Sequence, residues 1–210
     1  MNITTYKLRI TFTTRVLGTQ PQKEVATEYL LGKIANETGT MPEDELATLP
    51  QQLEKGTTAF HHLDGKPIYY DYMIKGFLKE AGSVFNGLRK VRNLRKKMTD
   101  FVFVAPRQIA LHTPDGWKPK PETLKDCPDA VTDYCERPLR AETAQGPRTT
   151  LARSEELPEG TWLECFVNVY DSSPITEDIL RDLLDYGADK GLGQWRNGGH
   201  GSFTYELEKQ

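Results

Sequence analysis

The stretch Lys190-Gly-Leu-Gly-Gln-Trp-Arg-Asn-Gly-Gly-His-Gly-Ser-Phe203 joins a helical pattern to a strand pattern near the end of the chain. Its five glycines allow a positive φ and let the backbone approach another group closely. Successive amides in such a segment can form a concave nest for a phosphate oxygen. Trp195 offers a face for base stacking, and Arg196 and His200 offer hydrogen-bond donors. The simpler alternative is an ordinary helix-to-strand connection, with Gly191 ending the helix.

Regular patterns flank this loop. Residues 175–188 carry apolar side chains at intervals of three and four, which predicts an amphipathic helix with Ser172 or Ser173 as its N-cap. Apolar and polar residues alternate over 162–169 and again over 203–208, so a strand is expected on each side of this helix. The last third of the chain therefore predicts strand, helix and strand, with the glycine-rich loop at the exit of the helix.

The earlier part of the chain predicts three more elements. Residues 6–13 alternate as a half-buried strand does. Apolar residues recur at helical spacing from Met73 to Leu88, with Asp71 placed to cap a long helix. Three glycines inside this pattern indicate close packing or a kink. Residues 101–104 form a short apolar run that predicts a strand.

These elements follow the order strand, helix, strand, strand, helix, strand. That order predicts an α+β, ferredoxin-like (RRM-like) fold, in which two helices cover one face of a four-stranded antiparallel sheet. We expect a single domain over residues 1–210 with two insertions, at about 18–70 and 113–158.

The insertions have weaker patterns. The first contains two expected helices, at 23–35 and 42–55, and a hairpin around the turn Asp64-Gly65. The second is expected to begin with a loop that lacks periodicity and to continue as a β-arm. The arms of that hairpin are predicted at 132–143 and 148–154.

Two motifs in this arrangement resemble the RAMP superfamily of CRISPR-associated RNA-binding proteins. The first is the C-terminal glycine-rich loop, with an Arg in its middle followed by Gly-x-Gly and an aromatic residue. The second is Tyr72-Met-Ile-Lys-Gly-Phe-Leu-Lys-Glu-Ala81, which is similar to the Lys-Gly-bearing start of the first helix in the backbone subunits. Tyr-Met-Ile stands here where the family usually has Pro-Gly-Ser before Lys-Gly. The resemblance covers about half of the chain.

The resemblance implies a non-catalytic protein that binds single-stranded RNA. The loop and Lys75 are expected to hold the phosphate backbone, and two groups of basic residues extend the track. For the group between Arg89 and Lys97, a solvated helix face is the simpler interpretation. The predicted RNA-binding residues are Lys75, Arg89, Arg92, Arg95, Lys96, Arg140, Arg148, Gly193, Trp195, Arg196, Gly198, Gly199, His200 and Gly201.

Two other functions stay open. Some members of this superfamily are metal-independent endoribonucleases that process CRISPR RNA, and His61 or His62 is the candidate general acid or base here, with Tyr69, Tyr70 or Lys66 as helper. The other alternative is an assembly or inhibitory module that docks on proteins, such as one encoded by a phage or another mobile element. The net charge of −3 favours this docking module, whereas the clustered arginines favour RNA.

Composition excludes several classes. No apolar run reaches membrane-spanning length, and the N-terminus lacks the apolar core of a signal peptide, so we expect a cytoplasmic protein without membrane contact. Three cysteines argue against a disulfide scaffold, and Cys165 is expected in the core. The spacing of Cys127, Cys135 and His112 fits no familiar zinc pattern, so we expect no metal and no cofactor. Self-association and protein partners stay open.

Overall fold

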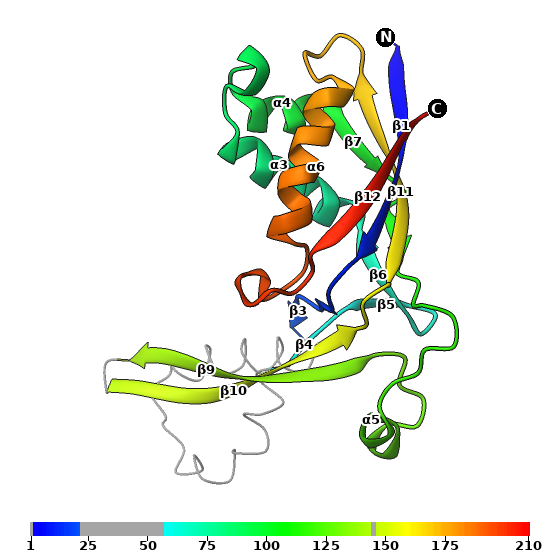
Figure 1. The fold of residues 1–210 in the computed structure, drawn as a ribbon, viewed down its shortest axis with the longest axis vertical. Helices are drawn as coiled ribbons and strands as arrows, with labels where there is room; N and C mark the ends of the chain where they lie inside the picture. The colour runs from blue at the N-terminus through cyan, green and yellow to red at the C-terminus, as the bar shows by residue number, and fades with distance from the viewer. Residues whose placement is uncertain (1, 22–56, 144–145) are drawn as a thin grey trace, which may run out of the picture. The chain divides into compact units, whose positions relative to one another are not determined.

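The computed structural model of the protein describes residues 2–21, 57–143 and 146–210. Contacts within the chain divide it into two compact units. Unit 1 comprises Met1–Val16, His61–Lys118 and Leu157–Gln210, and unit 2 comprises Leu17–Phe60 and Pro119–Glu156. Figure 1 shows their elements along the chain. The hairpin at residues 61–70, which the sequence analysis assigned to the first insertion, belongs to unit 1.

Unit 1 is built on a four-stranded antiparallel sheet with the strand order β12-β1-β11-β7. The strands are β1 (Ile3–Phe12), β7 (Val102–Ala105), β11 (Trp162–Tyr170) and β12 (Phe203–Lys209). β1 lies inside the sheet, where Leu8 is opposite Cys165 of β11 and Leu207 of β12. These three side chains are buried, as the alternating pattern predicted.

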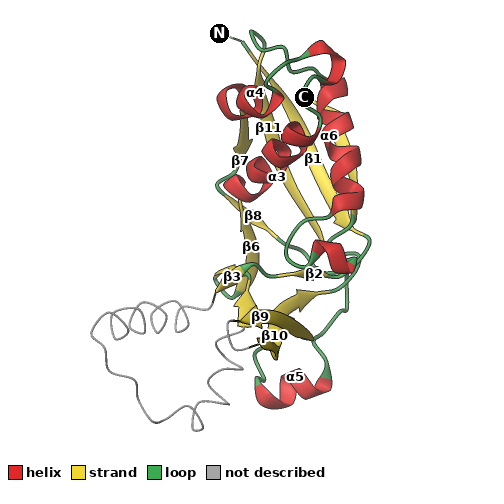
Figure 2. Cartoon of the chain, turned by 90° about the vertical axis from the view of Figure 1, so that its left-hand side faces the viewer, coloured by secondary structure: helices red, strands yellow, loops and turns green. Residues whose placement is uncertain are grey.

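Two helices, α3 (Asp71–Val84) and α6 (Glu177–Lys190), cover one face of this sheet (Figure 2). Each presents a stripe of buried apolar residues, including Ile74 and Leu78 of α3 and Leu183 of α6. The helices approach closely where Gly187 of α6 faces Phe77 of α3. A Cβ atom added to Gly187 lies only 1.9 Å from Cζ of Phe77, so this packing requires glycine.

The main elements of unit 1 follow one another as β1, α3, β7, β11, α6 and β12. In the sheet, the fourth of these strands lies beside the first, and the second lies at the opposite edge beside the third. The predicted α+β class is therefore confirmed.

The basic segment after α3 differs from the prediction. The expected helix ends at Val84 rather than Leu88, and a short 3₁₀ turn, η1 (Leu88–Lys90), leads to a separate helix, α4 (Leu94–Phe101). The backbone has positive φ at Gly87, Arg89, Lys90 and Asn93. A continuous α-helix cannot contain such residues, so the basic run is divided among η1, the turn that follows it and α4.

The N-terminal caps also differ from the prediction. Asp71 is the first residue of α3 rather than its cap, and its Oδ1 accepts a hydrogen bond of 2.8 Å from the backbone N–H of Tyr72. In α6 the cap is Thr176, whose Oγ1 accepts from the N–H of Ile179. Ser173 instead accepts from the N–H of Ile175, within the turn that precedes α6.

A small three-stranded sheet completes unit 1. Its strands are β5 (His61–Leu63), β6 (Lys66–Tyr70) and β8 (Gln108–Ala110), in that order. Asp64 and Gly65 connect β5 to β6 with φ values of 49° and 74°. Two positive φ values are typical of a tight two-residue hairpin turn, so this predicted turn is confirmed.

Unit 2 contains the predicted β-arm, formed by β9 (Asp133–Thr143) and β10 (Gly146–Leu157). β4 (Thr57–Ala59) runs parallel to β10 and also pairs with β3 (Gln20–Pro21). The short strand β2 (Val16–Leu17) marks the passage along the chain from unit 1 to unit 2.

One helix of unit 2 lies where a loop was expected. This is α5 (Pro121–Asp126), which has Pro121 in its first turn and buries none of its residues. A helix without a buried stripe has no apolar periodicity, so the pattern analysis missed it. The helices expected at 23–35 and 42–55 lie outside the described residues.

Candidate nucleic-acid interface

The glycine-rich loop is closed by its own backbone. The N–H of Leu192 donates to the carbonyl of Gly201 at 2.8 Å, and the N–H of Gly201 donates to the carbonyl of Arg15 at 2.9 Å. Gly201 has φ of +79°, and a Cβ atom there lies 1.8 Å from the carbonyl oxygen of Leu192. Only glycine fits this conformation and this close approach. Backbone hydrogen bonds therefore hold the two ends of the loop together and attach the loop to the segment that follows β1.

Trp195 and His200 pack against each other inside the loop. Their rings are stacked, with centroids 4.9 Å apart and an interplanar angle of 21°. A Cβ atom added to Gly198 lies 2.6 Å from the Trp195 ring, so this glycine makes room for the indole. His200 Nδ1 is buried and has no hydrogen-bond partner among the described residues.

Arg196, at the start of the 3₁₀ turn η2 (Arg196–Gly198), ties the loop to α3. Its Nη1 lies 2.9 Å from Oε2 of Glu80.

The remaining loop glycines differ from one another. Gly193 and Gly199 both have positive φ, and a Cβ atom on Gly199 meets nothing within 4 Å. The backbone at Gly199 is therefore open to a ligand from the side where a side chain would lie.

Two other predicted cations are also held by the protein. Arg89 Nε donates to Oδ2 of Asp182 on α6 at 2.6 Å. Lys75 Nζ donates to the backbone carbonyl of Thr99 in the last turn of α4 at 2.9 Å and lies 4.2 Å from the centre of the Phe103 ring. Partial burial, and then the charge of Lys79, lower the pKa of Lys75. Lys75 therefore provides a hydrogen-bond donor for a carbonyl at the C-terminal end of α4, which reduces its availability to a phosphate.

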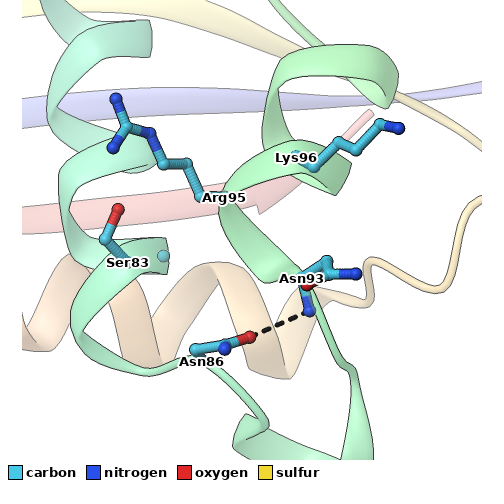
Figure 3. Close-up of a pocket in the computed structure, with 6 residues that line it drawn as sticks. Ser83, Asn86, Asn93, Arg95 and Lys96 are labelled. Atoms are coloured by element: carbon cyan, nitrogen blue, oxygen red, sulfur yellow. Dashed lines mark hydrogen bonds between the residues drawn. The ribbon is translucent and has the colours of Figure 1, made fainter.

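The basic residues in α4 and in the turn before it behave differently. Arg92, Arg95 and Lys96 are exposed, and none of them has a carboxylate partner within the described part of the chain. Arg95 and Lys96 line an open pocket of about 460 Å³ between α3 and α4, together with Gly82, Ser83, Asn86 and Asn93. In Figure 3 the Arg95 side chain extends from α4 toward α3, on the side of Ser83.

The pocket depends on two features of the junction between the helices. Gly82 allows the α4 backbone to approach, because a Cβ atom there lies 3.3 Å from the amide nitrogen of Arg95. Asn86 Oδ1 accepts a hydrogen bond of 2.9 Å from the N–H of Asn93, which has αL backbone geometry (Figure 3). The sequence analysis missed Ser83, Asn86 and Asn93. The Asn86-Gly87 dipeptide, a common turn signal, could have indicated the break between the helices.

The arginines of the β-arm lie in unit 2. Arg137 is buried and donates to Oγ of Ser154 at 2.9 Å, and the Arg153 guanidinium lies 3.9 Å from the centre of the Tyr134 ring. The backbones of Arg140 and Arg148 belong to β9 and β10, but their side chains lie outside what the structure describes.

The two candidate catalytic histidines have different surroundings. His61 Nε2 lies 3.3 Å from the hydroxyl of Tyr72, and burial, followed by His62, lowers the pKa of the His61 imidazole. His62 is exposed, opposite Pro67 in the hairpin. Of the expected helpers, Tyr70 packs edge-on against His61, whereas Tyr69 is fully buried. Tyr72 was not predicted as a partner.

Comparisons with known proteins give matches only among solved structures. No protein-family model matches the chain, and no curated protein matches it. A chain in a cryo-EM structure of the type III-B Cmr-beta bound to cognate target RNA matches with 13% identity and a TM-score of 0.45. That match covers 99% of this chain and 61% of the other. A chain of a type IV-B CRISPR complex matches with 13% identity and a TM-score of 0.43, covering 97% and 90% respectively.

Among the described helices, none combines the length and the apolar character that a bilayer crossing requires.

Proposed function

We propose that this chain is a non-catalytic RNA-binding protein of the RAMP type. In this proposal unit 1 is a ferredoxin-like domain and unit 2 is formed by its insertions. Three features support the proposal: the strand order of the main sheet, the glycine-rich loop between α6 and β12, and the Lys-Gly sequence at the start of α3.

The pocket between α3 and α4 is the observation that carries the proposal. Arg95 and Lys96 line it without a carboxylate partner among the described residues, and the side-chain amides of Asn86 and Asn93 add hydrogen-bond donors. The hydroxyl of Ser83, which also lines the pocket, donates to the carbonyl of Lys79. A phosphate group needs such a concave set of cations and hydrogen-bond donors. We place one or more backbone phosphates of single-stranded RNA in this pocket.

The other predicted cations have supporting roles in this proposal. Arg196 fixes the glycine-rich loop to α3 through Glu80, and Arg89 fixes η1 to α6 through Asp182. Both are held by carboxylates, so their charge is partly compensated before any RNA arrives. The loop contributes backbone groups near Gly199, where its surface is open.

The test compares two variants that remove positive charge from neighbouring parts of the chain. Arg95→Ala removes a cation that lines the pocket, whereas Arg89→Ala removes one that is paired with Asp182. The measurement is the dissociation constant for a fluorescent single-stranded RNA at several salt concentrations. We expect Arg95→Ala to weaken binding for all sequences alike and to flatten the salt dependence by about 0.7 per lost phosphate contact, while Arg89→Ala changes both quantities less.

Three outcomes contradict this proposal. An equal loss in both variants means that only overall charge matters. Absence of RNA binding at low salt removes the function altogether and favours the protein-docking alternative. Site-specific RNA cleavage in the presence of a metal chelator, abolished by His61→Ala, establishes the endoribonuclease alternative instead.

A further inference from the structure

A cluster of aromatic and basic side chains lies on the surface of unit 1, where β6 runs into α3. We call it the tyrosine platform, and it consists of Tyr70, Tyr72, His61 and Arg107. The rings of Tyr70 and Tyr72 are nearly parallel, with an interplanar angle of 14° and centroids 5.6 Å apart. The Arg107 guanidinium lies over both rings, 5.1 Å from the centre of Tyr70 and 5.4 Å from that of Tyr72.

The platform is held in place by contacts of its own. The Tyr72 hydroxyl lies within hydrogen-bond distance of His61 Nε2, and the His61 ring packs edge-on against Tyr70 with centroids 4.6 Å apart. Asp71 sits between the two tyrosines in the chain and forms an ion pair with Arg107 at 2.5 Å. The backbone adds a further link, because the N–H of Asp71 donates to the carbonyl of Arg107.

These groups are nevertheless accessible to a ligand. Tyr72 is 50% exposed, and the side chain of Arg107 is 66% exposed. A surface tyrosine with both its ring direction and its hydroxyl fixed has already lost much of its rotamer freedom, so a flat ligand that stacks on it loses less entropy on binding. Asp71 partly compensates the charge of Arg107, as carboxylates do for Arg89 and Arg196, but its contact to Arg107 is through Nη1 alone. The other N–H groups of this exposed guanidinium can still donate to an anionic group next to a flat ring.

We propose that the tyrosine platform binds an unpaired nucleobase of single-stranded RNA, with the base stacked on Tyr72 and the adjoining phosphate next to Arg107. A nucleotide combines a flat ring with an anionic phosphate, which matches the aromatic and cationic groups of the platform. His61 is a positioning residue that holds the Tyr72 hydroxyl. This inference rests on the proposed function and adds base contacts to phosphate contacts.

The experiment separates base contacts from phosphate contacts. Two probes are used: an oligouridine of about ten nucleotides and an abasic ribose-phosphate oligomer of the same length. Dissociation constants for both are measured with the wild type, Tyr72→Ala, Tyr72→Phe and a control, Ile3→Ala. Ile3 is also 50% exposed but lies on β1, outside the platform.

We expect the wild type to bind the oligouridine more tightly than the abasic oligomer, by about tenfold for one stacked base. Tyr72→Ala should abolish this difference and leave the affinity for the abasic oligomer within about twofold. Tyr72→Phe retains the ring and should keep most of the difference, and Ile3→Ala should keep all of it. Thermal unfolding of each variant shows whether it is folded.

The failures of the two proposals are distinguishable. If neither oligomer binds, the proposed function itself is wrong. If both bind the wild type equally, phosphate binding stands but the platform contacts no base, and the inference is overturned. A preference for the oligouridine over the abasic oligomer that survives Tyr72→Ala also overturns the inference. If Tyr72→Phe abolishes this preference as fully as Tyr72→Ala does, the base is held through the tyrosine hydroxyl, and stacking on the ring is overturned.

Discussion

Gly201 closes the glycine-rich loop in a way that no other residue can. Its φ is positive, and a Cβ atom there collides with the backbone carbonyl of Leu192 at 1.8 Å. Gly199 has a similar φ of +83°, but a Cβ atom there meets nothing within 4 Å. The two positions thus separate conformational strain from steric overlap.

For Gly201→Ala we expect a loss of at least about 2 kcal/mol in the free energy of unfolding, because strain and overlap act together. For Gly199→Ala the expected loss is about 1 kcal/mol, from strain alone. Urea denaturation of both variants beside the wild type is the measurement. Equal losses would mean that the loop shifts to admit a side chain at Gly201 and is less firmly closed than its hydrogen bonds indicate.

Sequence patterns predicted buried residues better than they predicted the partners of charged residues. The alternation that placed Leu8 and Cys165 in the core is a local property of each strand. The partner of a cation is not local: Arg89 and Asp182 are 93 positions apart, and Arg196 and Glu80 are 116 apart. Folding brings these residues together, so the sequence alone could not show which arginines were already paired.

At the level of elements, the contact between α3 and α6 depends on Gly187. The higher helix propensity of alanine should add up to about 1 kcal/mol to the free energy of unfolding. Overpacking against the buried ring of Phe77 should lower it by about 1–3 kcal/mol. We therefore expect Gly187→Ala to destabilise the protein. In a Phe77→Leu background the same change should be neutral or stabilising, and a double-mutant cycle measures this coupling.

Gly76→Ala is the matched control for this prediction. Gly76 also lies inside a helix, α3, but it is exposed and a Cβ atom there meets nothing within 4 Å. The propensity gain then has no steric cost, and stability should rise by about 0.5–1 kcal/mol. Destabilisation at both glycines would show that packing at Phe77 is not the cause.

Whether a segment forms a helix or a strand was predictable where one face of that segment is buried. The residues at which the segments begin and end were not predictable. Three strands of the main sheet and both covering helices follow from apolar periodicity, and the fourth strand, β7, follows from a short apolar run. The missed features depend on backbone geometry: the break after Val84 lies near several positive φ values, and the N-cap of α6 is Thr176 rather than an earlier serine. The pocket between α3 and α4 exists because of that break, so it could not be foreseen from a continuous helix.

At the scale of the whole molecule, Cys165 reports on the integrity of the main sheet. It is 1% exposed in β11, and burial raises the pKa of its thiol to about 12. The thiolate is the reactive form, so Cys165 should resist a thiol reagent at pH 8 while the protein is folded. Cys127 is exposed in unit 2 and should react at once.

Mass spectrometry of peptides after timed labelling in increasing urea measures both rates. Labelling of Cys165 should follow the global unfolding transition, whereas labelling of Cys127 should be fast throughout. Rapid modification of Cys165 without denaturant would show that the strands around it open locally.

The position of β1 has a consequence for biosynthesis. Both neighbours of this first strand, β11 and β12, come from the last quarter of the chain, and its cross-strand contact between Arg9 and Glu164 joins residues 155 positions apart. A ribosome must therefore complete most of this sequence before β1 can pair with either neighbour. Until then the nascent chain carries an alternating apolar strand with two open edges, which can pair with other chains. Translation that stops before Trp162 should thus yield fragments that aggregate or need a chaperone.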